Sequence, residues 1–143
     1  GLIFNSNYKF RSSIFNYDRD FLSGMSVSLD TVEEKLVSEL RLSPLQAKIF
    51  VLVIKNGKMT AEDISKKSEI SNDEALENAK KLIDLGGFID ITKSEFESMH
   101  PRFAVVNMYR RMCSRENIQF KKNLLVDNIA IVLEKPYDDA RTK

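Results

Sequence analysis

Residues 43–92 read SPLQAKIFVLVIKNGKMTAEDISKKSEISNDEALENAKKLIDLGGFIDIT. Three helix starts follow one another in this stretch. A hydroxyl residue that can accept a hydrogen bond from the backbone of a first helical turn recurs at Ser43, Thr60 and Ser71. Apolar residues then return every three or four positions, which is the period of an amphipathic helix. We therefore predict three helices that begin at these residues.

The last part of the stretch changes its period. The glycine pair at 86–87 ends the third helix, and residues 88–92 are mostly β-branched or aromatic, so they predict a strand. Residues 93–99 predict a turn and a return strand. The short connection at 69–71 holds two helices at an angle, as in a helix-turn-helix, and the strand pair after it predicts a winged helix. A plain helical hairpin in a larger bundle is the alternative, and the strand counts against it.

The segments on either side complete the predicted organisation. Asp30 or Thr31 starts a helix before the stretch. After Pro101 no proline or glycine occurs until Pro136, and apolar residues recur in steps of three and four, so we predict one long helix. The core of one small domain does not cover the apolar stripe of such a helix, so we predict a homodimer. The residues assigned to the dimer interface are Val106, Tyr109, Cys113, Phe120, Leu124 and Ile131.

The predicted fold class is mainly α, a winged helix-turn-helix with a small β-wing, an N-terminal helix and a long C-terminal dimerisation helix. Its parts are an aromatic-rich arm at 1–27, a winged helix-turn-helix domain at 28–100, the dimerisation helix at 101–135 and a charged tail at 136–143. The arm holds six of the 13 aromatic residues of the chain. It is either a flexible tail or a segment that docks on the body or on a protein partner, because so many exposed aromatics favour association.

Composition excludes several classes of function. The chain has 143 residues, with one cysteine, Cys113, and one histidine, His100. Catalytic and metal sites usually draw on several such residues, so we expect no enzyme, no metal and no cofactor, and we interpret His100 as a helix-start residue. A single unpaired thiol is typical of the reducing cytoplasm. No apolar run approaches the about 18 residues of a membrane span, and no secretory leader is recognisable.

Positive charge is concentrated in one part of the chain. The net charge is +1, a balance that does not by itself indicate a nucleic-acid binder. Between His100 and Lys122, however, six basic side chains stand against a single acidic one, Glu116. This basic run coincides with the predicted dimerisation helix.

Several short stretches resemble one family. The segments at 42–50 (LSPLQAKIF), 59–64 (MTAEDI), 70–71 (IS) and 82–89 (LIDLGGFI) look like the N-terminal winged-helix domain of the TrmB-like archaeal transcription regulators, and MarR-type regulators share much of the pattern. The resemblance covers about residues 42–100. It implies a sequence-specific regulator that binds double-stranded DNA as a homodimer. Longer members carry a C-terminal sugar-sensing domain for which this chain has no room, so we expect no sugar effector.

The resemblance implies a recognition helix at about 71–86. In the family this helix usually opens with Arg, Ser and Thr, whereas here Asp73 and Glu74 repel phosphates and weaken the electrostatic attraction to DNA. Asparagine and serine side chains are then expected to read base edges, and lysines to hold phosphates. The predicted DNA-binding residues are Lys66, Lys67, Ser71, Asn72, Asn78, Lys81 and Lys93.

A second hypothesis belongs to another class of function. A winged helix can also serve as a protein–protein interaction module within a larger complex. The acidic residues at 73, 74 and 77 and the aromatic arm favour this alternative, whereas the resemblance, the long helix and its basic run favour the DNA-binding regulator.

Overall fold

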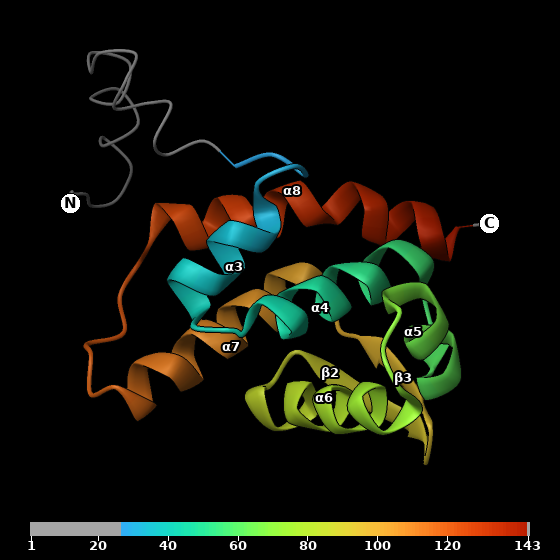
Figure 1. Ribbon diagram of the computed structural model, residues 1–143. Coiled ribbons are helices and arrows are strands. Elements are labelled where there is room, and N and C mark those ends of the chain that lie inside the picture. The colour runs from blue at the N-terminus through green and yellow to red at the C-terminus, as the bar shows by residue number, and fades with distance from the viewer. Residues whose placement is uncertain (1–26, 143) are drawn as a thin grey trace.

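The structure, a computed structural model, describes residues 27–142. The arm predicted at 1–27 lies outside these residues except for Val27, which packs against the core. The helices are α3 (Val32–Leu40), α4 (Pro44–Asn56), α5 (Ala61–Ser68), α6 (Asn72–Leu85), α7 (Pro101–Arg115) and α8 (Leu124–Arg141) (Figure 1). The strands are β1 (Met59–Thr60), β2 (Phe88–Thr92) and β3 (Glu95–Ser98).

The three helix starts predicted from hydroxyl residues are confirmed. Ser43 Oγ accepts a hydrogen bond from Gln46 N at 3.0 Å, while the Gln46 side chain accepts from Ser43 N. Thr60 makes the same reciprocal pair with Asp63. Ser71 Oγ accepts from the backbone N–H of the third residue of α6 at 3.1 Å. Each cap satisfies backbone donors that a helix start otherwise leaves without partners.

The strands form one antiparallel sheet in the order β1-β3-β2. The strand at 88–92 and its return strand are therefore confirmed, and β1 is an addition that the sequence did not predict. Met59 in β1 lies opposite Phe96, and Phe88 in β2 lies opposite Ser98. The chain is thus mainly helical with a small three-stranded antiparallel sheet, an arrangement compatible with a winged helix.

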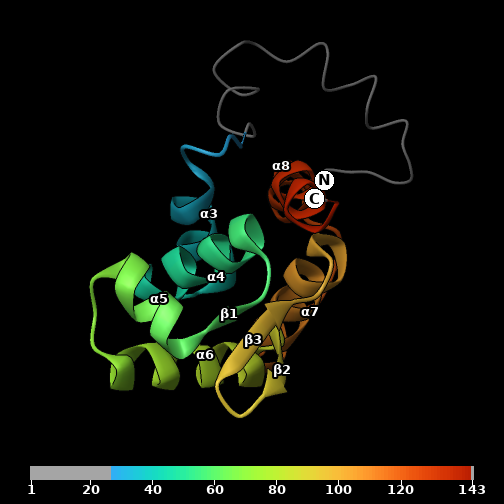
Figure 2. The ribbon, with the colours of Figure 1, turned by 90° about the vertical axis from the view of Figure 1, so that its right-hand side faces the viewer.

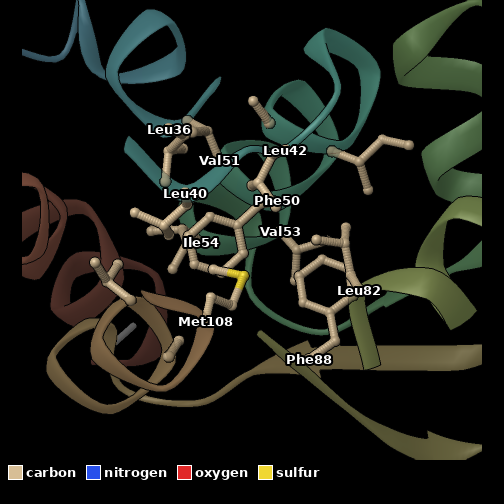
Figure 3. Packing of buried hydrophobic residues seen from close by; sticks show 14 of the residues in the cluster. Leu36, Leu40, Leu42, Phe50, Val51, Val53, Ile54, Leu82, Phe88 and Met108 are labelled. Atoms are coloured by element: carbon tan, nitrogen blue, oxygen red, sulfur yellow. The ribbon is translucent and has the colours of Figure 1, made fainter. Parts of the chain in front are cut away.

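The core joins these elements around α4. The rings of Phe50 and Phe88 stack with centroids 6.0 Å apart, and Leu82 and Met108 lie beside them (Figure 3). These residues come from α4, β2, α6 and α7. Figures 1 and 2 show α6 and strands β2 and β3 at one end of the molecule, α3 and α8 at the other, and α4 between them.

The prediction of one continuous helix at 101–135 is wrong. Helix α7 ends at Arg115, and Asn117 adopts a left-handed conformation with φ of 59°. Helix α8 begins only after Asn123, whose side-chain oxygen accepts hydrogen bonds from the backbone N–H groups of Leu125 and Val126. The break lets α8 turn back and pack on α7, so that each covers part of the apolar surface of the other.

The prediction that a charged tail begins at residue 136 is also wrong, because residues 136–141 are helical. Helix α8 continues through Pro136 and ends at Arg141. The last turns are held by contacts with other elements, since Tyr137 packs against the core and Arg141 binds the end of α4. These tertiary contacts outweigh the cost of an interior proline, which lacks one backbone donor.

Candidate nucleic-acid interface

Helix α6 buries one face and exposes the other along its length. Its buried residues are Ala75, Ala79 and Leu82, which face α4 and the core. Its opposite face is open to solvent. The exposed residues are Asn72, Asp73, Glu74, Glu77, Lys80, Lys81 and Asp84.

The connection between α5 and α6 has the shape of a tight turn. It spans residues 69–71, and Glu69 ends α5 in a left-handed conformation with φ of 59°. Ile70 N then donates a hydrogen bond to Ser65 O at 3.1 Å, and Ile70 packs against the core with Leu76. The turn thereby fixes the direction in which α6 leaves α5.

Three of the predicted DNA-binding residues have their polar groups engaged within the chain. Ser71 Oγ caps α6. The Asn78 amide donates a hydrogen bond to the carbonyl oxygen of Glu74 at 2.9 Å, which turns it along its own helix. Lys81 Nζ lies 3.3 Å from a carboxylate oxygen of Glu77.

The other predicted DNA-binding residues are exposed and spread over three elements, and a fourth of the seven, Lys66, is likewise paired within the chain. Lys66 Nζ pairs with Glu62 across one turn of α5 at 3.2 Å. Lys67 follows it, Asn72 opens α6, and Lys93 lies in the turn between β2 and β3. The exposed ion pair is weak and breaks readily for a phosphate, so it does not prevent such a contact.

The charge of this region opposes a nucleic acid. Residues 61–98, which include α5, α6, β2 and β3, carry ten acidic and five basic side chains. Phosphate attraction supplies most of the sequence-independent affinity for DNA. Helices α5 and α6 and the β2–β3 hairpin therefore lack the electrostatic attraction that a DNA-binding surface needs.

A basic surface adjoins the C-terminal end of α6. Arg111, on α7, donates a hydrogen bond from Nη1 to the carbonyl oxygen of Asp84 at 2.7 Å. Asn107, one turn earlier, donates from Nδ2 to the carbonyl oxygen of Gly86 at 3.1 Å. Residues 99–122 carry six basic side chains against one acidic side chain. The charge run is visible in the sequence, but its position beside α6 depends on tertiary packing.

The residues predicted for the dimer interface divide into buried and exposed sets. Tyr109 and Cys113 are buried inside the chain, so their assignment to an interface between chains is wrong. Burial raises the pKa of the Tyr109 hydroxyl. Val106 and Leu124 are half-buried. Phe120 and Ile131 remain exposed, at 46% and 54% of their surface.

His100 stands at the start of α7, as its position before Pro101 predicts. Its Nδ1 accepts a hydrogen bond from Arg102 N at 3.1 Å, and its ring packs edge-on against Tyr137.

Among residues 27–142, no group of three or more His, Cys, Asp or Glu side chains is arranged to hold a metal ion. None of the helices in the same range has the length and apolar character needed to cross a bilayer.

Neither a protein-family model, nor a curated protein, nor a solved structure matches this chain.

Proposed function

We propose that the chain is a cytoplasmic, winged-helix transcription regulator of the TrmB-like archaeal type, which binds double-stranded DNA as a homodimer. The observation that carries the proposal is the order α4-β1-α5-α6-β2-β3, in which a three-residue turn sets α6 across α5 and a β-hairpin follows directly. The exposed face of α6 runs its whole length, as a helix that enters a major groove requires.

In this proposal Asn72, at the exposed start of α6, reads a base edge. The homodimer forms on exposed apolar residues of α7 and α8, since Phe103 and Ile131 are at 70% and 54% of their full exposure. Large apolar side chains that remain exposed are available for such an association.

The test is selection of duplexes from a random pool, followed by measurement of binding to the selected site. We expect a near-palindrome with half-sites roughly 34–36 Å apart, because a two-fold dimer presents α6 twice. Asn72→Ala should cost roughly 1–3 kcal/mol of discrimination per half-site and leave non-specific binding unchanged. A pool with no enriched sequence would contradict a sequence-specific regulator.

A protein–protein interaction module is the second candidate function. The acidic excess of residues 61–98 favours it, because a surface with ten acidic and five basic side chains attracts a basic protein partner more readily than a nucleic acid. The two candidates separate in one experiment. The module is supported over the regulator if a basic peptide binds the α6 face and Glu77→Gln abolishes that binding. The same result requires that no duplex binds the protein at about 50 mM salt.

A further inference from the structure

We propose that the DNA backbone is bound by helix α7 and the turn after it, and not by the lysines of the helix-turn-helix. The surface consists of Arg110, Arg111, Arg115 and Lys121, and we name it the α7 basic surface. Its ligand is a row of duplex phosphates beyond the C-terminal end of α6. This inference rests on the proposed function and identifies where the electrostatic affinity of that function comes from.

The first support is the attachment of the α7 basic surface to α6. The bonds from Arg111 to Asp84 O and from Asn107 to Gly86 O hold the middle of α7 against the last turn of α6. Gly86 is suited to this contact, because a Cβ at that position would lie 2.7 Å from Asn107 Nδ2. Figure 1 shows the C-terminal parts of α6 and α7 at the same side of the molecule.

The second support is that the guanidinium groups are available. Arg110, Arg111 and Arg115 are exposed and take no part in the ion pairs found among residues 27–142. The Arg110 guanidinium lies over the Phe120 ring, 5.1 Å from its centroid, an arrangement that orients the group and leaves N–H donors for a phosphate. Arg111 uses one of its five donors on Asp84.

The third support is that the single acidic residue of the run is neutralised. Glu116 pairs with Arg41, at the end of α3, with 3.3 Å between Nε and a carboxylate oxygen. Arg41 thus offsets the charge of Glu116, the one acidic side chain within residues 99–122. The surface keeps its positive potential next to a helix-turn-helix region that is acidic overall.

The length of α6 allows one continuous duplex to contact both Asn72 and the α7 basic surface. Helix α6 has 14 residues, and at ~1.5 Å per residue it is about 20 Å long. A duplex that meets Asn72 at one end of α6 therefore reaches the α7 basic surface within one helical turn of about 34 Å. The phosphates that flank the groove are then the groups that the arginines contact.

The experiment compares the parent with three charge-removing variants and one charge-keeping variant in titrations of a labelled random-sequence duplex from about 50 to 200 mM salt. The charge-removing variants are Arg110→Gln/Arg115→Gln, the helix-turn-helix variant Lys67→Gln/Lys93→Gln, and the matched control Lys48→Gln/Lys135→Gln. Each variant removes two exposed positive charges, so net charge is the same in all three. Circular dichroism checks that each is folded, and Arg110→Lys/Arg115→Lys keeps the charge without the planar group.

We expect Arg110→Gln/Arg115→Gln to lower the slope of log Kobs against log salt by roughly two units per protomer and to weaken binding roughly 100-fold at about 50 mM salt. The Lys67→Gln/Lys93→Gln and Lys48→Gln/Lys135→Gln proteins should stay within about threefold of the parent, and Arg110→Lys/Arg115→Lys should keep its slope.

Two results would overturn the inference in different ways. If only Lys67→Gln/Lys93→Gln loses the slope, the phosphates lie on the helix-turn-helix, and the proposed function survives without the α7 basic surface. If the parent binds no duplex at about 50 mM salt, the proposed function fails and this inference fails with it. Binding of polyglutamate that is lost in Arg110→Gln/Arg115→Gln would then mark the surface as a site for an acidic protein.

Discussion

Arg141, in the last turn of α8, donates a hydrogen bond from Nη1 to the backbone carbonyl oxygen of Ile54 at 2.9 Å. The same guanidinium pairs with Glu97 of β3 and lies over the Tyr137 ring, 3.7 Å from its centroid. One side chain thus joins the end of α8 to α4 and to the sheet. Its carboxylate partner is mostly buried, so the pair is less screened than a surface pair.

The first prediction concerns this junction. Arg141→Ala should lower the free energy of unfolding by roughly 2–4 kcal/mol, because Glu97 is left mostly buried without its partner. Lys135→Ala is the control, since Lys135 makes an exposed pair with Asp139 and should cost less than about 0.5 kcal/mol. Urea denaturation measures both. Equal losses would show that the Arg141 junction adds no stability.

The second prediction concerns the contact between α6 and α7. Gly86→Ala should destabilise the protein by roughly 1–3 kcal/mol, because φ is +98° and the new Cβ would meet Asn107 Nδ2. The cost should shrink in an Asn107→Ala background, where the clash is absent but the backbone strain remains. A double-mutant cycle by thermal unfolding gives the coupling. No coupling would mean that Asn107 moves aside freely.

The third prediction concerns the start of α5. The pKa of Asp63 lies below its ordinary value of 3.8. The main cause is the hydrogen bond that its carboxylate accepts from Thr60 N, and the hydrogen bond with the Thr60 side chain adds to it. A native pKa below the unfolded one stabilises the fold above the unfolded value, and this contribution is lost as the pH falls through the native pKa.

Asp63→Asn should therefore flatten the acid side of the stability-against-pH curve, between about pH 2 and pH 5. Asp90→Asn, which removes a carboxylate in β2 outside any helix cap, is the control and should change the curve less. Urea midpoints at a series of pH values measure the effect. Identical acid slopes for the parent and Asp63→Asn would contradict the role of this cap.

The fourth prediction concerns association. If the α7–α8 hairpin forms the dimer interface, Ile131→Glu should place a charge in an apolar contact and convert the dimer to a monomer. Leu29→Glu makes the same change at another exposed apolar residue and should leave the dimer intact. Light scattering at micromolar concentration distinguishes the two. A parent protein that is already monomeric would remove the basis for the dimer.

The fifth prediction concerns the acidic face of α6. Asp73→Asn/Glu74→Gln removes two negative charges from the exposed start of the helix and should raise non-specific duplex affinity about tenfold at low salt. Glu33→Gln/Glu34→Gln makes the same change on α3 and should have a smaller effect. Fluorescence anisotropy measures both. An equal gain for the two variants would show that only net charge matters.

The sequence by itself determined where helices begin. The caps at Ser43, Thr60 and Ser71 are contacts between residues three positions apart, so they depend on no distant part of the chain. The glycine at 86 likewise ends α6 because its left-handed backbone conformation is local. The strand at 88–92 follows from residue type and from the glycine pair before it.

Only the tertiary structure decided how the last third of the chain divides into two helices and which of their residues are buried. Residues 102–135 contain no proline or glycine, and their apolar residues recur in steps of three and four. This period alone cannot show that Asn117 and Asn123 divide the segment into two helices. The break is stable because α8 buries its apolar side on α7 and α4, a contact between residues far apart in sequence. The same packing buries Tyr109 and Cys113 within one chain and brings Arg111 of α7 to the end of α6. Charge and helical period can be read from neighbouring residues in the sequence. Which residues lie next to each other in space depends instead on which distant apolar surfaces pack together.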